Sequence, residues 1–175
     1  AAFLGCKALG LADRNTLAGT LAFQEACEKY KLQPIIGETI VVAIDYDPDS
    51  KDLPETFELK LYAENKEGWE NLLYISKEIN VTYHGFIPDT VLYQRTKGLA
   101  CVIPTASHFN HISTDYEKAR KLLKRYKNVF DVVYYQIDTV EYSSSSLFKK
   151  HLAALDRYLC DFRKKVKPIV INDSY

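Results

Sequence analysis

The chain has 175 residues, of which 47% are hydrophobic and 26% are charged. This is enough apolar material to bury a core in one ordinary domain, so the composition excludes an intrinsically disordered protein. The 23 basic and 23 acidic residues cancel; the net charge therefore excludes a surface that attracts nucleic acid all over, although a local basic patch stays open as an alternative.

The cysteines and the apolar runs indicate the cellular compartment in which the protein works. Cys6, Cys27, Cys101 and Cys160 lie far apart with no C-x-x-C pair, which disfavours a zinc ribbon and a disulfide-rich secreted framework and favours a reducing, cytoplasmic setting. No apolar run is long enough to cross a bilayer, and the first ten residues lack the features of a signal peptide. Because the chain does not begin with Met and its first residues read as part of a helix, we expect a fragment of a longer protein.

The first half of the chain alternates strands with helices. Residues 7–13 form an apolar run that predicts a buried strand, and a helix follows, with Asn15 or Thr16 as its expected N-cap. Leu17, Leu21 and Ala22, together with residues 25–30, fit the spacing of that helix. Pro34 precedes a long apolar strand that we expect to end near residue 44.

A hairpin and a second helix come next. Residues 57–63 alternate with a period of two, which predicts an antiparallel partner for the preceding strand across a polar loop. Asn65 is the expected cap of a helix. One face of that helix carries Trp69, Leu72, Leu73, Ser76 and Ile79.

The second half continues the alternation. Strands are expected at residues 98–104, 131–138 and 167–173. A helix is expected to start at Thr114 and a second one after Ser145 or Ser146. The first of these has an apolar stripe of Ala119, Leu122, Leu123 and Tyr126. This order predicts an α/β protein in which helices cover a mostly parallel sheet, in one domain over residues 1–175.

Three acids fall in or after predicted strands, where α/β proteins gather their sites. They are Asp13, Glu38 and Asp173. A cap or turn role and a metal or phosphate role both remain open for Asp13, and a structural strand-end role is the leading interpretation for Asp173. A hydrolytic bimetal centre also needs histidines, and none of His84, His108, His111 and His151 ends a predicted strand.

Several segments resemble a known family. The segments KALGLADRNTLAGTLAFQEACEKYKLQPIIGE, LKLYAENKEGWENLLYIS, GLACVIP and KPIVINDSY are similar in order and spacing to the PHP (polymerase and histidinol phosphatase) domain of bacterial DNA polymerase III alpha subunits. The most specific pieces are ADRNTLAG, which is similar to the family's T-D-H-G-x-x-x-G turn, and AENKEGWENL. The resemblance implies a distorted seven-stranded (β/α) barrel, here without its start.

Metal-binding members of that family hold up to three ions with His, Asp, Glu and Cys at the barrel mouth and can support phosphoesterase or 3′-5′ exonuclease chemistry. Matched residue by residue, this chain departs from that pattern. Asp13 keeps the family's acid, but Arg14 follows where the family has histidine. Glu38 is displaced by one residue, with Thr39 at the expected position, and on a strand such a shift points the carboxylate to the other face.

The remaining matched positions also differ. Glu58 replaces a histidine, Thr105 replaces a cysteine, and Tyr175 replaces the last histidine, whereas Asp173 is kept. Arg14 places a fixed positive charge where a cation would sit, and we expect it to pair with Asp13 or Asp173. By this resemblance the eight positions are vestiges of a metal site, and the domain has no catalytic residue, no metal ligand set and no cofactor.

The leading hypothesis is a metal-free scaffold that steadies a DNA polymerase and docks a proofreading exonuclease. In that hypothesis the partners are the remainder of the polymerase chain and the exonuclease, and DNA is contacted by the parent polymerase rather than by this domain. The main alternative is an active phosphoesterase or 3′-5′ exonuclease that uses zinc or manganese. A free-standing adaptor with the same fold is a third alternative.

Overall fold

The computed structural model describes residues 2–104, 115–137 and 166–171. The chain divides into two units, Ala1–Ala100 and Cys101–Tyr175, which are described in turn. Seven strands are assigned to one sheet, and helices accompany them. The mixed α/β class predicted from the alternating pattern is thereby confirmed.

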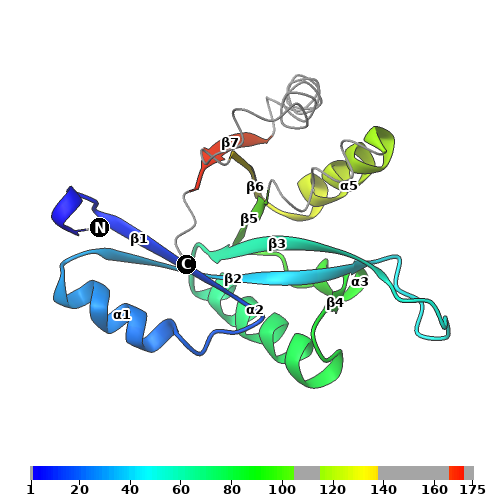
Figure 1. Ribbon diagram of the computed structural model, residues 1–175, viewed down its shortest axis with the longest axis horizontal. Coiled ribbons are helices and arrows are strands. Elements are labelled where there is room, and N and C mark those ends of the chain that lie inside the picture. The colour runs from blue at the N-terminus through cyan, green and yellow to red at the C-terminus, as the bar shows by residue number, and fades with distance from the viewer. Residues whose placement is uncertain (1, 105–114, 138–165, 172–175) are drawn as a thin grey trace, which may run out of the picture. The chain divides into compact units, whose positions relative to one another are not determined.

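The first unit contains most of the described elements (Figure 1). In chain order they are η1 (Ala2–Leu4), β1 (Ala8–Arg14), α1 (Thr20–Lys29), β2 (Gln33–Ile44), β3 (Glu55–Ala63), α2 (Lys66–Lys77), η2 (Glu78–Thr82), β4 (Ile87–Pro88) and α3 (Asp89–Leu92). The strand β5 (Leu99–Ile103) begins in this unit and ends in the second.

The strands β1, β2 and β3 lie side by side. β1 runs parallel to β2, with Asp13 opposite Glu38 and Arg14 opposite Thr39. β2 and β3 form the predicted antiparallel hairpin, in which Thr39 lies opposite Lys60. The short strand β4 pairs with β2 in parallel. This register fixes which side chains share a face, because neighbours at paired positions point the same way and successive residues alternate.

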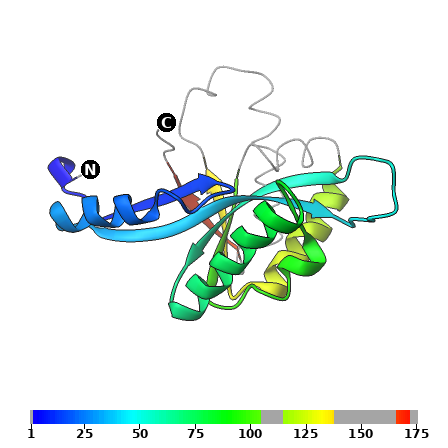
Figure 2. The ribbon, with the colours of Figure 1, turned by 90° about the horizontal axis from the view of Figure 1, so that it is seen from below.

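The helices α1 and α2 lie against one face of these strands, called here the helix-covered face (Figure 2). Its core combines residues of β2 and β3 with residues of α2 and η2. The fully or nearly fully buried members include Ile40, Val42, Phe57, Leu59, Leu61, Leu72, Ile75 and Ile79. Their burial removes apolar area from water, which is the main favourable term that holds the unit together.

The helix α1 begins later than the sequence predicts. Its first residue is Thr20, and Gly19 occupies the cap position without a side-chain hydrogen bond. Asn15 instead adopts a left-handed conformation with φ 51°, which asparagine tolerates better than most residues. The Thr16 hydroxyl accepts a hydrogen bond from the Ala18 N–H at 3.1 Å. The expected caps therefore form a turn, and the prediction that either residue caps α1 is wrong.

The helix α2 begins where expected. The Asn65 side chain accepts a hydrogen bond from the Gly68 N–H at 2.9 Å, which confirms it as the N-cap. Leu72 is buried as predicted, whereas Leu73 is 45% exposed and Ile75 is buried in its stead. The helix continues into η2, a π-helical turn.

The second unit contains the end of β5, the helix α5 (Tyr116–Val129), and the strands β6 (Val132–Ile137) and β7 (Lys167–Val170). β6 and β7 pair in parallel. The predicted apolar stripe of α5 is confirmed, since all four of its residues are buried. Asp115 caps this helix, accepting a hydrogen bond from the Lys118 N–H at 3.0 Å; Thr114 and the expected helix after Ser145 or Ser146 lie outside the described residues.

None of the helices among the described residues has both the length and the apolar character that a membrane span requires.

Candidate functional site

Five of the eight positions that the sequence matches to a metal site fall within the described residues. They are Asp13, Arg14, Glu38, Thr39 and Glu58. They lie at the carboxyl end of β1 and the adjoining parts of β2 and β3, with Arg14, Thr39 and Glu58 on one face of the strands and Asp13 and Glu38 on the other. The other three positions, Thr105, Asp173 and Tyr175, lie outside the described residues.

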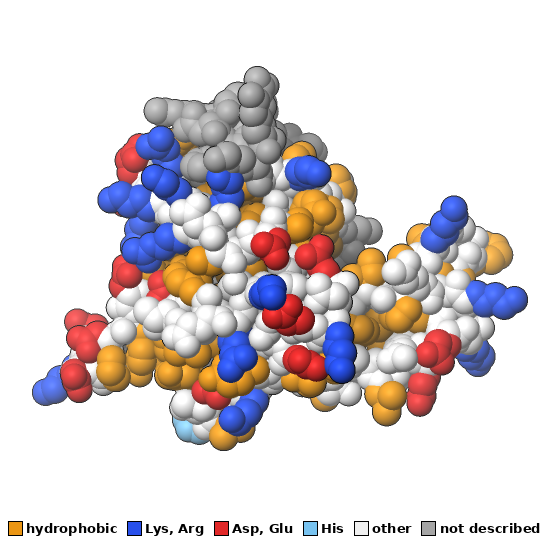
Figure 3. Space-filling view, turned by 180° about the vertical axis from the view of Figure 1, so that it is seen from behind, with side chains coloured by type: hydrophobic (Ala, Val, Ile, Leu, Met, Phe, Trp, Pro, Cys, Tyr) orange, Lys and Arg blue, Asp and Glu red, His pale blue; other side chains and the backbone are white. Residues whose placement is uncertain are grey.

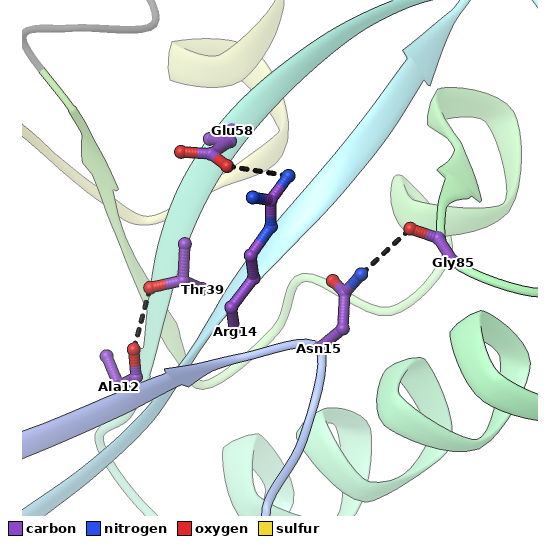
Figure 4. Close-up of polar contacts among 6 residues, drawn as sticks. All are labelled: Ala12, Arg14, Asn15, Thr39, Glu58 and Gly85. Carbon is purple, nitrogen blue, oxygen red and sulfur yellow. Dashed lines mark hydrogen bonds and ion pairs between the residues drawn. The ribbon is translucent and has the colours of Figure 1, made fainter.

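Arg14, Thr39 and Glu58 share the face of the strands opposite to α1 and α2, called here the cationic face (Figure 4). Arg14 reaches across β2, and its Nη2 lies 3.0 Å from Glu58 Oε1. The register explains this contact, since Arg14 is opposite Thr39 and Glu58 is opposite Val41 on the same face of β2.

The described structure gives Arg14 a partner that the sequence does not suggest. The sequence suggests Asp13 or Asp173, but the described structure pairs Arg14 with Glu58. Asp13 is its neighbour in the strand and points to the other face, and Asp173 lies outside the described residues. The two paired side chains are 66% and 38% exposed, so solvent screens the ion pair and its contribution to stability is small.

Thr39 connects β2 to β1 on the cationic face. Its hydroxyl donates a hydrogen bond to the Ala12 carbonyl at 2.7 Å and so ties β2 to β1. Lys60, opposite Thr39, is only 8% exposed and adds a second cation that sequence reasoning missed. The alternation over residues 57–63 places Glu58 and Lys60 on the same face of the strand, so this pattern could have identified Lys60 as part of the cationic face.

Glu38 lies on the helix-covered face and is completely buried. The Ser76 hydroxyl of α2 donates a hydrogen bond to Glu38 Oε1 at 3.0 Å, while Oε2 is buried without a hydrogen-bond partner among the described residues. Burial raises the pKa of Glu38 to about 7, and the hydrogen bond from Ser76 lowers it only in part. Glu38 and Thr39 thus point to opposite faces, and Glu38 does not contribute a carboxylate to the cationic face.

Asp13 also points away from Arg14. A Cβ added to Gly19 would lie 2.8 Å from Asp13 Oδ2, so this carboxylate sits beside the first turn of α1. A negative charge is favourable at the amino end of a helix, where backbone N–H groups lack helical partners. This position agrees with the turn role left open for Asp13.

Asparagine side chains connect the end of β1 to η2 and to the segment that follows it. Asn15 Nδ2 donates a hydrogen bond to the Gly85 carbonyl at 2.8 Å, and Asn80 Nδ2 donates to the Asn15 carbonyl at 3.0 Å (Figure 4 shows the first of these). These contacts join residues 65 and 70 positions apart. Local sequence patterns carry no signal of them, which is why Asn15 is predicted only as a cap.

The described residues do not fit a cluster of divalent cations. The cationic face offers one carboxylate already paired with a guanidinium and one hydroxyl already donating to the backbone, whereas zinc and manganese need several imidazole or carboxylate ligands. Within the described ranges, no group of three or more His, Cys, Asp and Glu side chains has a geometry that could hold a metal ion.

Comparison with known proteins identifies the fold family. The family model described as PHP domain matches residues 1–139. The DNA polymerase III subunit alpha of Helicobacter pylori (strain ATCC 700392 / 26695) is 26% identical over 150 residues, which cover 75% of this chain and 12% of that protein.

Two further relatives are also DNA polymerase III alpha subunits. The DNA polymerase III subunit alpha of Campylobacter jejuni is 25% identical over 188 residues, covering 98% of this chain and 15% of that protein. That of Bacillus subtilis (strain 168) is 32% identical over 101 residues, covering 58% of this chain and 9% of that protein. The chain thus spans a small fraction of the length of the curated relatives that it matches.

The seven-stranded sheet with helices is consistent with part of the (β/α) barrel that the resemblance implies. Because the family model covers residues 1–139 of 175, well over half of the chain, this chain belongs to the PHP domain family.

Proposed function

We propose that this chain is a PHP domain of a DNA polymerase III alpha subunit that serves DNA replication as a metal-free scaffold. The relatives named above support the polymerase context. In this proposal the domain steadies the remainder of the polymerase chain, docks a proofreading exonuclease and works in the cytoplasm. Nucleotide transfer belongs to other parts of the polymerase.

One observation carries the metal-free part of the proposal. Arg14 occupies the position where the family's turn has a histidine, and its guanidinium forms an ion pair with Glu58, another position where the family has a histidine. Two positions that hold metal ligands in the family are thus occupied here by a cation and an anion, which form an ion pair with each other. A divalent cation at this place would face a fixed positive charge instead of two neutral imidazoles.

Metal content tests the proposal directly. The purified protein is exposed to zinc and manganese, dialysed, and measured by elemental mass spectrometry. We expect a metal content near zero per chain for the wild type. A stoichiometric content of two or more ions would overturn the metal-free proposal and favour the alternative, an active phosphoesterase or 3′-5′ exonuclease.

A further inference from the structure

The helix α5 concentrates positive charge in a chain that is neutral overall. Between residues 116 and 129 it carries six basic residues and one acidic residue, a net charge of +5, whereas the whole chain has a net charge of +0. The basic residues are Lys118, Arg120, Lys121, Lys124, Arg125 and Lys127. The whole-chain balance therefore hides a local excess.

The apolar stripe of α5 fixes where these cations point. Leu122, Leu123 and Tyr126 are buried, so the opposite side of the helix faces solvent. Four cations are exposed there, Arg120, Lys121, Lys124 and Arg125, and they are called here the basic face of α5. Figure 3 shows Lys and Arg side chains gathered over this helix.

Helix stability does not explain this arrangement. Cations favour the last turn of a helix, which accounts for Lys127 but not for Arg120 and Lys121 near the amino end. Arg120 with Lys124 and Lys121 with Arg125 are like-charged pairs at i and i+4, and each such pair destabilises a helix slightly. Glu117 lies 3.6 Å from Arg120, and no other acid occurs within α5.

We propose that the basic face of α5 binds the phosphate backbone of duplex DNA. Residues three or four apart on a helix have Cβ atoms about 5–6 Å apart, so these long cationic side chains can reach several phosphates of a duplex, which carries one negative charge per about 1.7 Å of its axis. Single-strand binding needs exposed rings on which bases stack, but Tyr126 of α5 and Tyr135 of β6 are fully buried, and Tyr116 and Tyr134 are half-buried. Duplex backbone contact thus fits better than base recognition.

The choice of DNA over an acidic protein surface rests on the proposed polymerase function. The inference nevertheless departs from the expectation that DNA is contacted by the parent polymerase alone. That expectation belongs to the scaffold hypothesis. The neutral net charge does not contradict the inference, because it averages over the chain and cannot report the charge of one helix.

The test compares two triple variants of equal charge. Lys121→Gln/Lys124→Gln/Arg125→Gln removes three cations from the basic face, and Lys29→Gln/Lys51→Gln/Lys66→Gln removes three exposed cations from the first unit. Binding of a short fluorescent DNA duplex is measured by anisotropy between about 50 and about 200 mM salt, and circular dichroism checks that both variants fold. We expect the α5 variant to bind on the order of tenfold more weakly or worse and its salt dependence to be less steep by roughly 0.9 per lost contact.

The outcomes separate this inference from the proposed function. No duplex binding by the wild type at the lower salt, or equal losses in both variants, would overturn the inference and turn attention to an acidic protein partner. Primer extension by the full-length protein tests the proposed function by itself. If the full-length protein extends primers but the two triple variants bind duplex DNA equally well, only the α5 inference fails. If primer extension is absent but the α5 variant alone loses duplex binding, only the polymerase assignment fails.

Discussion

The buried carboxyl of Glu38 links the stability of the first unit to pH. Its pKa is about 7, compared with an ordinary value of 4.5, because burial disfavours the charged form. Between these values the folded state binds more protons than the unfolded state, so the free energy of unfolding falls as the pH rises. The contribution of Glu38 is fully present below about pH 4.5 and is lost as the pH rises through about 7.

Replacing Glu38 with glutamine should remove this dependence. Glutamine keeps an oxygen that accepts a hydrogen bond from Ser76 but cannot ionise. We expect the variant to be more stable than the wild type above pH 7, by at most about 3 kcal/mol from the shift in pKa, and to differ less at about pH 4.5. Urea titrations of the variant and the wild type at about pH 4.5 and above pH 7 measure this. If the two proteins differ in stability by the same amount at both pH values, Glu38 is not the titrating group.

Two glycines on the cationic face form a matched pair for testing packing. A Cβ added to Gly37 would lie 2.5 Å from the Leu61 carbonyl oxygen and 2.5 Å from the Tyr62 ring, whereas a Cβ added to Gly10 would lie 3.7 Å from the same ring. The first distance requires the backbone to shift, and the second is an ordinary van der Waals contact.

Gly37→Ala should therefore destabilise the protein by roughly 1–3 kcal/mol, and Gly10→Ala should be close to neutral or slightly stabilising. Thermal or chemical unfolding of the two variants measures the difference. Equal effects would mean that β2 and β3 can separate at Gly37 without cost.

At the scale of the element, α2 depends on its cap. The Asn65 side chain satisfies the N–H of Gly68, and Asn71 Nδ2 donates to the Lys97 carbonyl at 2.9 Å. Gly98 adopts φ +71°, and its carbonyl accepts from the Glu64 N–H at 3.0 Å. The start of α2 and the turn before β5 thus hold each other in place.

Asn65→Ala should cost about 1 kcal/mol of the free energy of unfolding, since it leaves a helix N–H without its acceptor. Asn65→Asp keeps that acceptor and should lose much less. Unfolding titrations compare the two variants, and an aspartate variant as unstable as the alanine variant would show that the cap hydrogen bond is not what matters at this position.

The helix α1 shows what helical periodicity leaves undetermined. Leu21 is 68% exposed and Cys27 is the buried residue of the helix. Phe23, Ala26 and Tyr30 line an apolar pocket of about 540 Å³, together with Leu9 and Leu32. Periodicity predicts that apolar residues share a side of a helix, but how deeply they are buried depends on what the sheet places against them.

At the scale of the whole molecule, the residues of the cationic face decide whether phosphoesterase activity is expected. Arg14→His restores one ligand type on the cationic face, but Thr39 and Glu58 would remain where the family's metal-binding members have ligands. We expect the variant to show no phosphoesterase activity with zinc or manganese, because one imidazole cannot hold a hydrolytic metal cluster. Activity that appears in the variant and not in the wild type would mean that the remaining positions can still assemble a site.

The sequence by itself determined the α/β class, the β2–β3 hairpin, the Asn65 cap, the stripe of α5 and the PHP family. These follow from patterns within a few residues or from segment similarity. The tertiary structure alone decided that Arg14 pairs with Glu58, that Glu38 accepts a hydrogen bond from Ser76, and that Asn15 binds Gly85. Each of these joins residues 38 to 70 positions apart. Such partners are fixed by strand register and by which face of the sheet α1 and α2 cover, and local composition determines neither.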